Sequence, residues 1–154
     1  MYEIKHLTPA DVALLRELNA VFGAAFNAPE SYAANRPNTE YLQDLLAKQH
    51  VIGLVAMAGK AVVGGLVAYE LPKFEQARSE IYIYDLAVAE SHRRRGVATA
   101  LIRHLQEIAS QRGAWVIFVQ ADYGDDPASA LYTKLGVRED VLHFDIPVPG
   151  NQRK

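Results

Sequence analysis

Three consecutive arginines and a glycine, Arg93 to Gly96, stand between a β-branched run and a long amphipathic segment. At the start of a helix the first backbone N–H groups have no acceptor within the helix, and the helix dipole is positive there. Gly96 lets an anion approach the main chain closely, and arginine side chains bind the edges of a phosphate. The turn therefore predicts a binding site for a phosphorylated ligand.

Acidic residues follow the last long apolar run and recur near the C-terminus. They are Asp122, Asp125, Asp126, Glu139, Asp140 and Asp145. The first three lie in one loop and favour a site for a cationic ligand, although a loop of solvated charges has the same composition. Asp126 is also a candidate cap for a helix with Pro127 at its first position. An anion site and a cation site on one chain predict two unlike ligands.

Composition limits the class of protein. The chain has 154 residues, half of them hydrophobic, which predicts one domain over residues 1–154 with a flexible tail at 147–154. A net charge of −2 argues against a nucleic-acid partner, and the apolar runs are too short for a membrane partner. The absence of cysteine excludes thiolate sites and suits a reducing cytoplasm. The histidines form no i, i+4 pair, so we expect no metal site.

Hydrophobic periodicity and turn residues predict the elements that must position these groups. Strands are expected at residues 2–7, 51–58, 61–71, 80–88, 115–119 and 141–146, with a hairpin turn at Gly59-Lys60. Helices are expected from Thr8-Pro9 through Phe22, from Thr39 to Leu46, from Val97 to Arg112 with Gly113 as its stop, and from Asp126-Pro127 to Gly136. The order βααβββαβαβ predicts an α/β fold with a mixed sheet flanked by helices.

Longer motifs resemble a known family. The pattern Arg93-x-x-Gly96-x-Ala98, the strand Asp85-Leu86-Ala87-Val88 before it, and the later Ala130-Leu131-Tyr132-x-x-x-Gly136 resemble the GNAT superfamily of N-acetyltransferases, whose co-substrate is acetyl-CoA. The segments 71–76, 79–88 and 119–127 are similar to the aminoglycoside 3-N-acetyltransferases within it. The likeness covers roughly residues 41–146. It implies a single-domain GNAT fold and transfer of acetyl to an amine of an aminoglycoside, which would inactivate the antibiotic.

The resemblance also implies how acetyl-CoA binds. Its pyrophosphate would lie on backbone N–H groups of the turn and helix start, with the arginines around it: Arg93, Arg94, Arg95, Gly96, Val97, Ala98 and Thr99. Its pantetheine arm would run beside Leu86, Ala87 and Val88, where a bulge frees backbone groups in such enzymes. The Leu86 amide would stabilise the oxyanion that forms during attack. Asp125 stands where relatives often have an asparagine that contacts pantetheine.

Proton transfer needs an acid for the departing thiolate and a base for the attacking amine. Tyr132 is the expected acid, and its alternative is an ordinary core tyrosine. Asp85 or Glu80 is the candidate base, although Asp85 has an equal claim to be a buried structural carboxylate. An amine that arrives neutral needs no base at all.

An aminoglycoside carries several ammonium groups, so its binding surface should be acidic. The candidates are Tyr84, Asp85, Asp122, Tyr123, Asp125 and Asp126. Acetylation of another polyamine or of a protein amine, and a CoA-binding module without catalysis, are the alternative functions. A homodimer is possible, since the family often pairs through sheet edges or terminal strands.

Overall fold

The computed structural model describes residues 2–28, 32 and 36–151. The chain forms two compact units, Met1–Gln120 and Ala121–Lys154. The α/β class and the mixed sheet predicted from the sequence are both confirmed. The first unit contains every strand found among the described residues.

The first unit is built on a five-stranded sheet in the order β1-β2-β3-β4-β5. The strands are β1 Glu3–His6, β2 Val51–Ala58, β3 Ala61–Pro72, β4 Ser79–Val88 and β5 Ala114–Val119. Neighbours are antiparallel except β4 and β5, which run parallel because α4 connects them. The predicted hairpin joins β2 to β3, and Gly59 supplies the positive φ of +63° that its turn requires.

Local sequence explains where the helices of this unit begin and end. They are the 3-10 turn η1 Pro9–Asp11, α1 Val12–Ala25, α3 Thr39–Ala47, η2 Glu90–His92 and α4 Val97–Arg112. Thr8 caps η1 as predicted, whereas α3 is capped by Asn38 through its side-chain oxygen. Gly113 ends α4 in the left-handed conformation, which also confirms the prediction.

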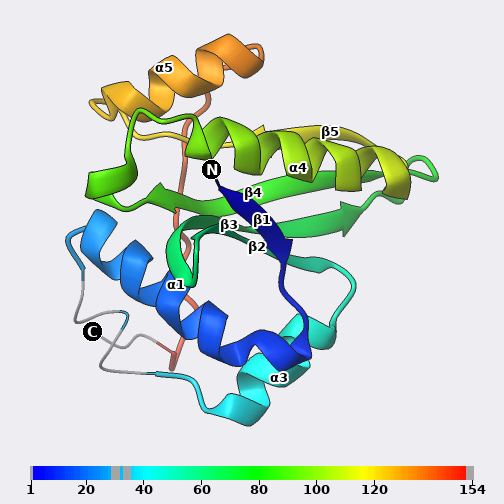
Figure 1. Cartoon of the computed structure of the whole chain (residues 1–154). Coiled ribbons are helices and arrows are strands. Elements are labelled where there is room, and N and C mark those ends of the chain that lie inside the picture. The colour runs from blue at the N-terminus through cyan, green and yellow to red at the C-terminus, as the bar shows by residue number, and fades with distance from the viewer. Residues whose placement is uncertain (1, 29–31, 33–35, 152–154) are drawn as a thin grey trace. The chain divides into compact units, whose positions relative to one another are not determined.

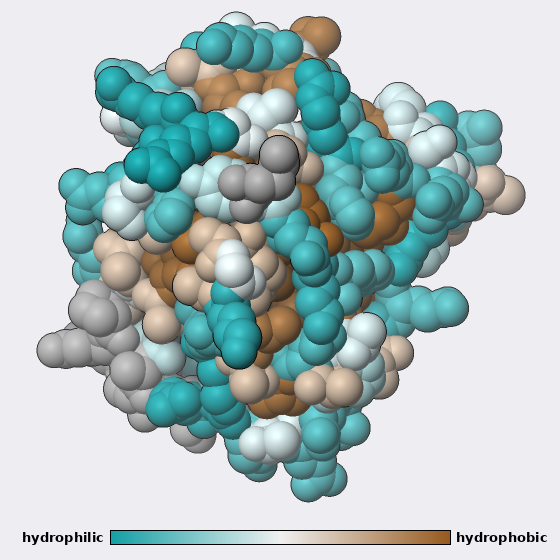
Figure 2. Space-filling model, viewed as in Figure 1, coloured by the Kyte–Doolittle hydropathy of each residue, from teal (hydrophilic) through white to brown (hydrophobic). Residues whose placement is uncertain are grey.

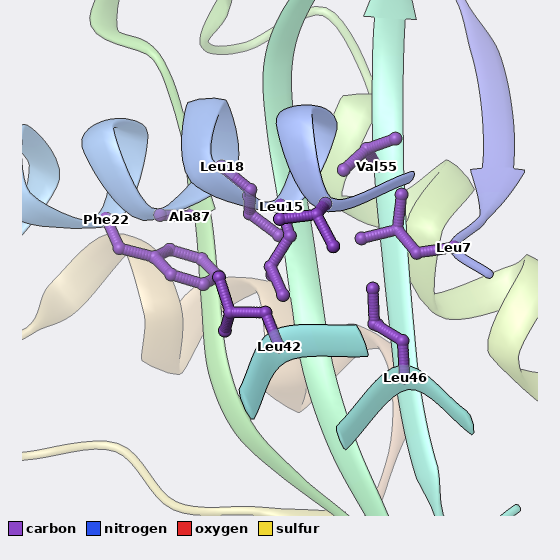
Figure 3. Packing of buried hydrophobic residues seen from close by; sticks show 9 residues of the cluster. Leu7, Leu15, Leu18, Phe22, Leu42, Leu46, Val55 and Ala87 are labelled. Carbon is purple, nitrogen blue, oxygen red and sulfur yellow. The ribbon is translucent and has the colours of Figure 1, made fainter. Parts of the chain in front are cut away.

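Helices α1 and α3 cover one face of the sheet with aliphatic and aromatic side chains. Figure 3 shows Leu15, Leu18 and Phe22 of α1 packed with Leu42 and Leu46 of α3. Val55 of β2 and Ala87 of β4 complete this layer from the sheet. Ala87 is the neighbour of Leu86, so the packing that holds the core also fixes the strand where the site is expected.

Helix α4 covers the opposite face (Figure 1). Its buried side chains include Leu101, Leu105 and Ile108. Strand β2 is buried on both faces from Val51 to Ala56, as expected for a strand with helices on either side. Hydrophilic residues cover much of the visible surface, and brown apolar groups show between them (Figure 2).

The second unit contains one helix, α5 Asp126–Leu135, within its described residues. The predicted cap was wrong by one position: the Asp125 carboxylate, not that of Asp126, accepts a hydrogen bond from the Ala128 N–H. Asp126 is the first helical residue, where a negative side chain suits the helix dipole. Gly136 ends the helix as predicted, and its N–H donates to the Tyr132 carbonyl.

The predicted strand Val141–Ile146 is wrong. The structure assigns no strand to these residues, and they pair with no other strand of the described chain. Their large side chains are exposed, for example Leu142 at 83% and Ile146 at 86%. Alternating apolar residues specify which face of a strand is hydrophobic. A strand also needs a neighbouring strand to hydrogen-bond with, and the local sequence does not identify that neighbour.

Candidate functional site

Strand β4 changes its surroundings halfway along its length. From Ser79 to Ile83 it pairs with β3 on one side and with β5 on the other. The pairing with β5 stops at Ile83, which faces Val119, the last residue of β5. From Tyr84 to Val88 the strand keeps β3 as its neighbour and has no ladder on its other edge within the described residues. This open edge contains the segment that the sequence assigned to the pantetheine arm.

A β-bulge marks the change. Val67 of β3 pairs with Asp85, and the next residue, Ala68, pairs with Ile83, so Tyr84 is the extra residue. Bulges of this kind re-aim side chains and interrupt pairing next to functional sites. The bulge expected from the resemblance is therefore present in β4.

Backbone alternation shows which amides face the open edge. The Ala89 N–H donates to the Val63 carbonyl of β3 at 2.8 Å. In an antiparallel pair the N–H groups of successive residues point to opposite edges, so Ala87 also faces β3. The N–H groups of Leu86 and Val88 then point to the open edge. The predicted oxyanion donor thus has the orientation that its role requires.

The arginine turn follows directly. The Arg93 side chain donates from Nε to the Val88 carbonyl at 3.1 Å, which ties the turn to the end of β4. Arg94 and Gly96 both have positive φ, +61° and +80°. A non-glycine residue in that region is uncommon and is typical of tight, functional turns. The turn therefore has a defined backbone shape before any ligand binds.

Helix α4 starts without a capping side chain. Its first intrahelical bond is made by the Ala100 N–H to the Gly96 carbonyl at 3.0 Å. The N–H groups of Val97, Ala98 and Thr99 precede that bond and have no acceptor in the helix. By contrast α3 and α5 begin with a side chain that accepts from their first turn. The start of α4 keeps its donors available for an anion.

Arg94 and Arg95 are exposed beside these donors. Within the part of the chain that the structure describes, neither side chain forms a hydrogen bond or an ion pair. Free guanidinium groups next to free amides fit a pyrophosphate, because both kinds of donor bind phosphate oxygens. The residues present therefore fit the group that the sequence predicted for this turn.

Asp85 lies one residue before the Leu86 amide and has a partly buried carboxylate. Burial raises the pKa of Asp85 above its ordinary value of 3.8. No lysine, arginine or histidine among the described residues forms an ion pair with it. Its neighbours are tyrosines: burial, and then the Asp85 charge, raise the pKa of both Tyr32 and Tyr69. A carboxylate in this environment holds a proton more readily than a solvated one.

Glu80 has a different environment. Its carboxylate lies 3.6 Å from the Lys73 ammonium. It precedes Leu86 by six residues on the same strand, a separation of about 20 Å at the usual rise. Glu80 and the Leu86 amide are therefore not brought together.

The remaining candidates lie in the second unit. Asp122, Tyr123 and Asp126 are exposed, Tyr123 at 86%. Asp125 is exposed too, but one of its oxygens is engaged in capping α5. Burial, with a smaller contribution from the Asp125 charge, raises the pKa of Tyr132 to about 12. Tyr132 is therefore protonated at neutral pH, as a proton donor must be.

No local signal in the sequence predicted that further aromatic residues would gather near Asp85. Tyr69 faces Tyr82 across the β3–β4 ladder, and Phe118 of β5 stacks on Tyr82 with ring centroids 4.7 Å apart. Only the strand register creates these neighbours, because Tyr69 and Phe118 are far apart in the chain. A prediction of the bulge position and both registers would have been needed to find them.

The described residues contain neither a cluster of metal ligands nor a membrane-spanning helix. No group of three or more histidine, cysteine or acidic side chains gathers there in a way that would hold a metal ion. No described helix combines the length and apolar character needed to cross a membrane.

Known proteins resemble this chain in sequence. The sequence model of a family described as "Acetyltransferase (GNAT) family" matches residues 14–137. N-acetyltransferase 8B of Rattus norvegicus is 28% identical over 90 residues, which are 58% of this chain and 40% of the rat protein. Streptothricin acetyltransferase of Streptomyces lavendulae is 27% identical over 47% of this chain and 39% of its own length. The matched region thus spans about two fifths of these relatives.

Solved structures match over nearly the whole chain. An aminoglycoside acetyltransferase from an uncultured soil metagenomic sample is 59% identical, covers 96% of this chain and 99% of its own, and has a TM-score of 0.95. A second aminoglycoside acetyltransferase from such a sample, in complex with sisomicin, is 30% identical with 96% of both chains covered and a TM-score of 0.87.

Proposed function

This chain belongs to the acetyltransferase (GNAT) family, and from that premise we propose that it transfers acetyl from acetyl-CoA to an amine of an aminoglycoside. One observation carries the proposal. The open edge of β4 leads directly into the uncapped start of α4, through a turn with two free arginines. Backbone donors for a pantetheine arm and for a pyrophosphate therefore follow one another in a single continuous segment.

In the proposed complex each part of this segment has its own task. The turn and the first residues of α4, from Arg94 to Thr99, hold the pyrophosphate with backbone N–H groups. The arm lies along Leu86, Ala87 and Val88 as an added strand would. Arg93 holds the turn against the end of β4, because its Nε donates to the Val88 carbonyl.

The reaction follows from the groups at the bulge. The amine nitrogen attacks the thioester carbonyl carbon, and the Leu86 N–H donates to the oxygen that becomes negative. Asp85 accepts the proton that the nitrogen loses, directly or through a water. When the carbon–sulfur bond breaks, the Tyr132 hydroxyl donates its proton to the thiolate. An amide and a free thiol result, with Asp85 protonated and Tyr132 ionised. Asp85 then loses its proton to solvent and Tyr132 regains one from it, which restores both groups.

Asp85 is a better candidate for the base than Glu80. Its raised pKa makes it a stronger base than an ordinary aspartate, and none of the described cationic side chains forms an ion pair with it. Glu80 is paired with Lys73 and lies about 20 Å along the strand from the Leu86 amide. A base must come within hydrogen-bond reach of the proton it removes.

The acceptor is inferred from charge and likeness. In the first unit, Asp85 and Tyr84 at the bulge are an acidic and an aromatic group of the kind that binds a polycationic sugar. In the second unit, the proposed groups of the same kind are Asp122, Tyr123, Asp125 and Asp126. The motifs at residues 71–76, 79–88 and 119–127 favour acetylation of the 3-amine. Both solved relatives described above carry the name aminoglycoside acetyltransferase. We also expect the protein to be cytoplasmic. A homodimer is a further expectation, and sedimentation at several protein concentrations tests it.

Turnover with candidate acceptors tests the function. Purified protein is incubated with acetyl-CoA and gentamicin or sisomicin, and released thiol is measured. We expect steady thiol release, with NMR of the product showing acetyl on the 3-nitrogen. Thiol release with other polyamines or a protein amine, together with no release with any aminoglycoside, would show that the acceptor is not an aminoglycoside. Binding of acetyl-CoA in calorimetry without any release would identify a non-catalytic module.

Tyr132→Phe tests the acid. The variant keeps the ring and removes the hydroxyl, so kcat should fall by about 10²-fold while the affinity for acetyl-CoA changes little. Tyr41→Phe is the control, since it removes a hydroxyl from an exposed tyrosine of α3 that is not part of the proposed site. Equal kcat values for the wild type and Tyr132→Phe would remove Tyr132 from the mechanism.

A further inference from the structure

Four aromatic side chains form a continuous group on one face of the sheet, which we call the aromatic cluster: Tyr69, Tyr82, Tyr84 and Phe118. The rings of Tyr82 and Phe118 are stacked at 4.7 Å and nearly parallel. Tyr84 meets Tyr82 edge to face at 5.7 Å and Tyr69 at 6.0 Å. Three neighbouring strands thus each contribute to one aromatic surface.

The aromatic cluster is not part of the closed core. Tyr84 is 63% exposed, and the other three members are only partly buried. Cross-strand aromatic pairs do stabilise a sheet, and this alone would explain the stack of Tyr82 on Phe118. It does not explain Tyr84, which the bulge sets outside the ladder and leaves in solvent. Contiguous exposed aromatic side chains are typical of binding surfaces.

Polar groups border the aromatic cluster. The Tyr82 hydroxyl donates to Oε1 of Gln120 at 2.9 Å, which fixes the ring, and Gln120 is exposed. Asp85 adjoins Tyr84 in the chain and interacts electrostatically with Tyr69 and Tyr82. Aromatic faces and a carboxylate attract the same kind of group, an ammonium, because a ring face is electron-rich.

The position of the aromatic cluster relative to the reaction is set by β4. Leu86 and Asp85 mark the point of acetyl transfer in the proposed mechanism. Tyr82 precedes Asp85 by three residues, about 10 Å along a strand. This is on the order of the length of two linked sugar rings. An acceptor whose amine reaches Asp85 therefore has room to extend over the aromatic cluster.

We propose that the aromatic cluster binds the part of the acceptor that is not acetylated, an amino-sugar ring whose ammonium group lies against Tyr84 and its neighbours. This inference rests on the proposed function and goes beyond it, since it makes Tyr69, Tyr82 and Phe118 part of the substrate site. It also gives a physical reason for selecting polyamines: the first amine reacts at Asp85, and a second ammonium is held by the rings.

Substitution of the exposed ring tests the proposal. With sisomicin and acetyl-CoA as probes, Tyr84→Leu should raise the KM for sisomicin about 5-fold and leave the KM for acetyl-CoA unchanged. Tyr84→Phe keeps the ring face and should stay within about 2-fold of the wild type. Phe118→Leu should change KM in the same direction as Tyr84→Leu. Trp115→Leu is the control, because Trp115 is an exposed ring of β5 that contacts Arg78 instead of the aromatic cluster.

The outcomes separate two failures. If the wild type acetylates sisomicin and both leucine variants keep its KM, the aromatic cluster does not bind the acceptor and the inference is overturned. An equal rise in the KM for acetyl-CoA would overturn it as well, since that would indicate a general disturbance of the sheet. If the wild type acetylates no aminoglycoside, the proposed function has failed first, and the inference falls with it.

Discussion

Two partly buried carboxylates, Glu70 of β3 and Asp85 of β4, lie beside the two halves of strand β4 and have opposite surroundings. Next to the paired half lies Glu70, whose oxygens accept from the Ser79 hydroxyl at 2.7 Å and from Arg112 Nη1 at 2.8 Å. Burial alone would raise the pKa of Glu70, but these hydrogen bonds outweigh it and the pKa is lowered. In the open half lies Asp85, where burial raises the pKa and no cation of the described residues pairs with the carboxylate.

The difference separates a structural role beside the paired half of β4 from a functional role in its open half. Glu70 is stabilised in its charged form and ties the start of β4 to the end of α4, since Arg112 belongs to that helix. Asp85 is destabilised in its charged form, which costs folding free energy and gives a stronger base. The backbone shows the same division. In the paired half the amides hydrogen-bond to two neighbouring strands, whereas in the open half the amides of Leu86 and Val88 have no strand partner among the described residues.

The largest expected effect comes from removing the free amide. Leu86→Pro deletes an N–H that faces the open edge, so no ladder bond is lost and the fold should survive. The kcat should fall by about 10² to 10³-fold, the usual loss for one oxyanion donor. Thiol release measures it. Ala87→Pro is the matched control: its N–H faces β3, so this variant should lose cooperative unfolding. Full activity of Leu86→Pro would show that the donor lies elsewhere.

Asp85→Asn should lower kcat by about 10²-fold and raise stability at the same time. The folded state binds the Asp85 proton more tightly than the unfolded state does. The free energy of unfolding of the wild type therefore falls as pH rises above the ordinary aspartate pKa of 3.8. The variant should therefore be more stable at pH 7, and the difference should close below about pH 4. Thermal unfolding across pH measures this. A less stable variant with normal kcat would identify Asp85 as a structural carboxylate.

Glu70→Gln should do the reverse, with the smallest effect on catalysis. The free energy of unfolding should fall by about 1 to 2 kcal/mol at pH 7, because charged hydrogen bonds are weakened. The folded-state pKa is lowered, so the wild-type advantage is present above the ordinary value of 4.5 and disappears as pH falls. Urea unfolding at two pH values measures it, and kcat should be unchanged. A large loss of kcat would show that the two halves of β4 are not independent.

The sequence predicted most of the first unit because local signals decide its elements. Gly59-Lys60 defines the hairpin, and Gly113 ends α4 through a left-handed conformation that suits glycine. The capping of α5 was misassigned between two adjacent aspartates, since Asp125 and Asp126 carry the same side chain. The roles of Asp85, Leu86 and Tyr132 came from motif likeness and stay predictions that the variants above test.

The strand predicted at 141–146 shows the limit of local signals. Its alternating apolar residues satisfy the preference for extended backbone, but pairing depends on a neighbour that may come from anywhere in the chain. The same limit hid the aromatic cluster. Tyr69 and Phe118 become neighbours of Tyr82 through two separate registers, one antiparallel and one parallel.

By itself the sequence determined most of the helices and strands, the arginine turn and the presence of a carboxylate before Leu86. These depend on residues within one or two turns of each other, where capping, backbone preference and periodicity act. Only the tertiary structure decided that β5 stops pairing at Ile83, that Tyr84 bulges, and that Asp85 is buried without a cation while Glu70 has one. Such properties arise from burial and from contacts between distant segments, and both exist only once the chain has folded.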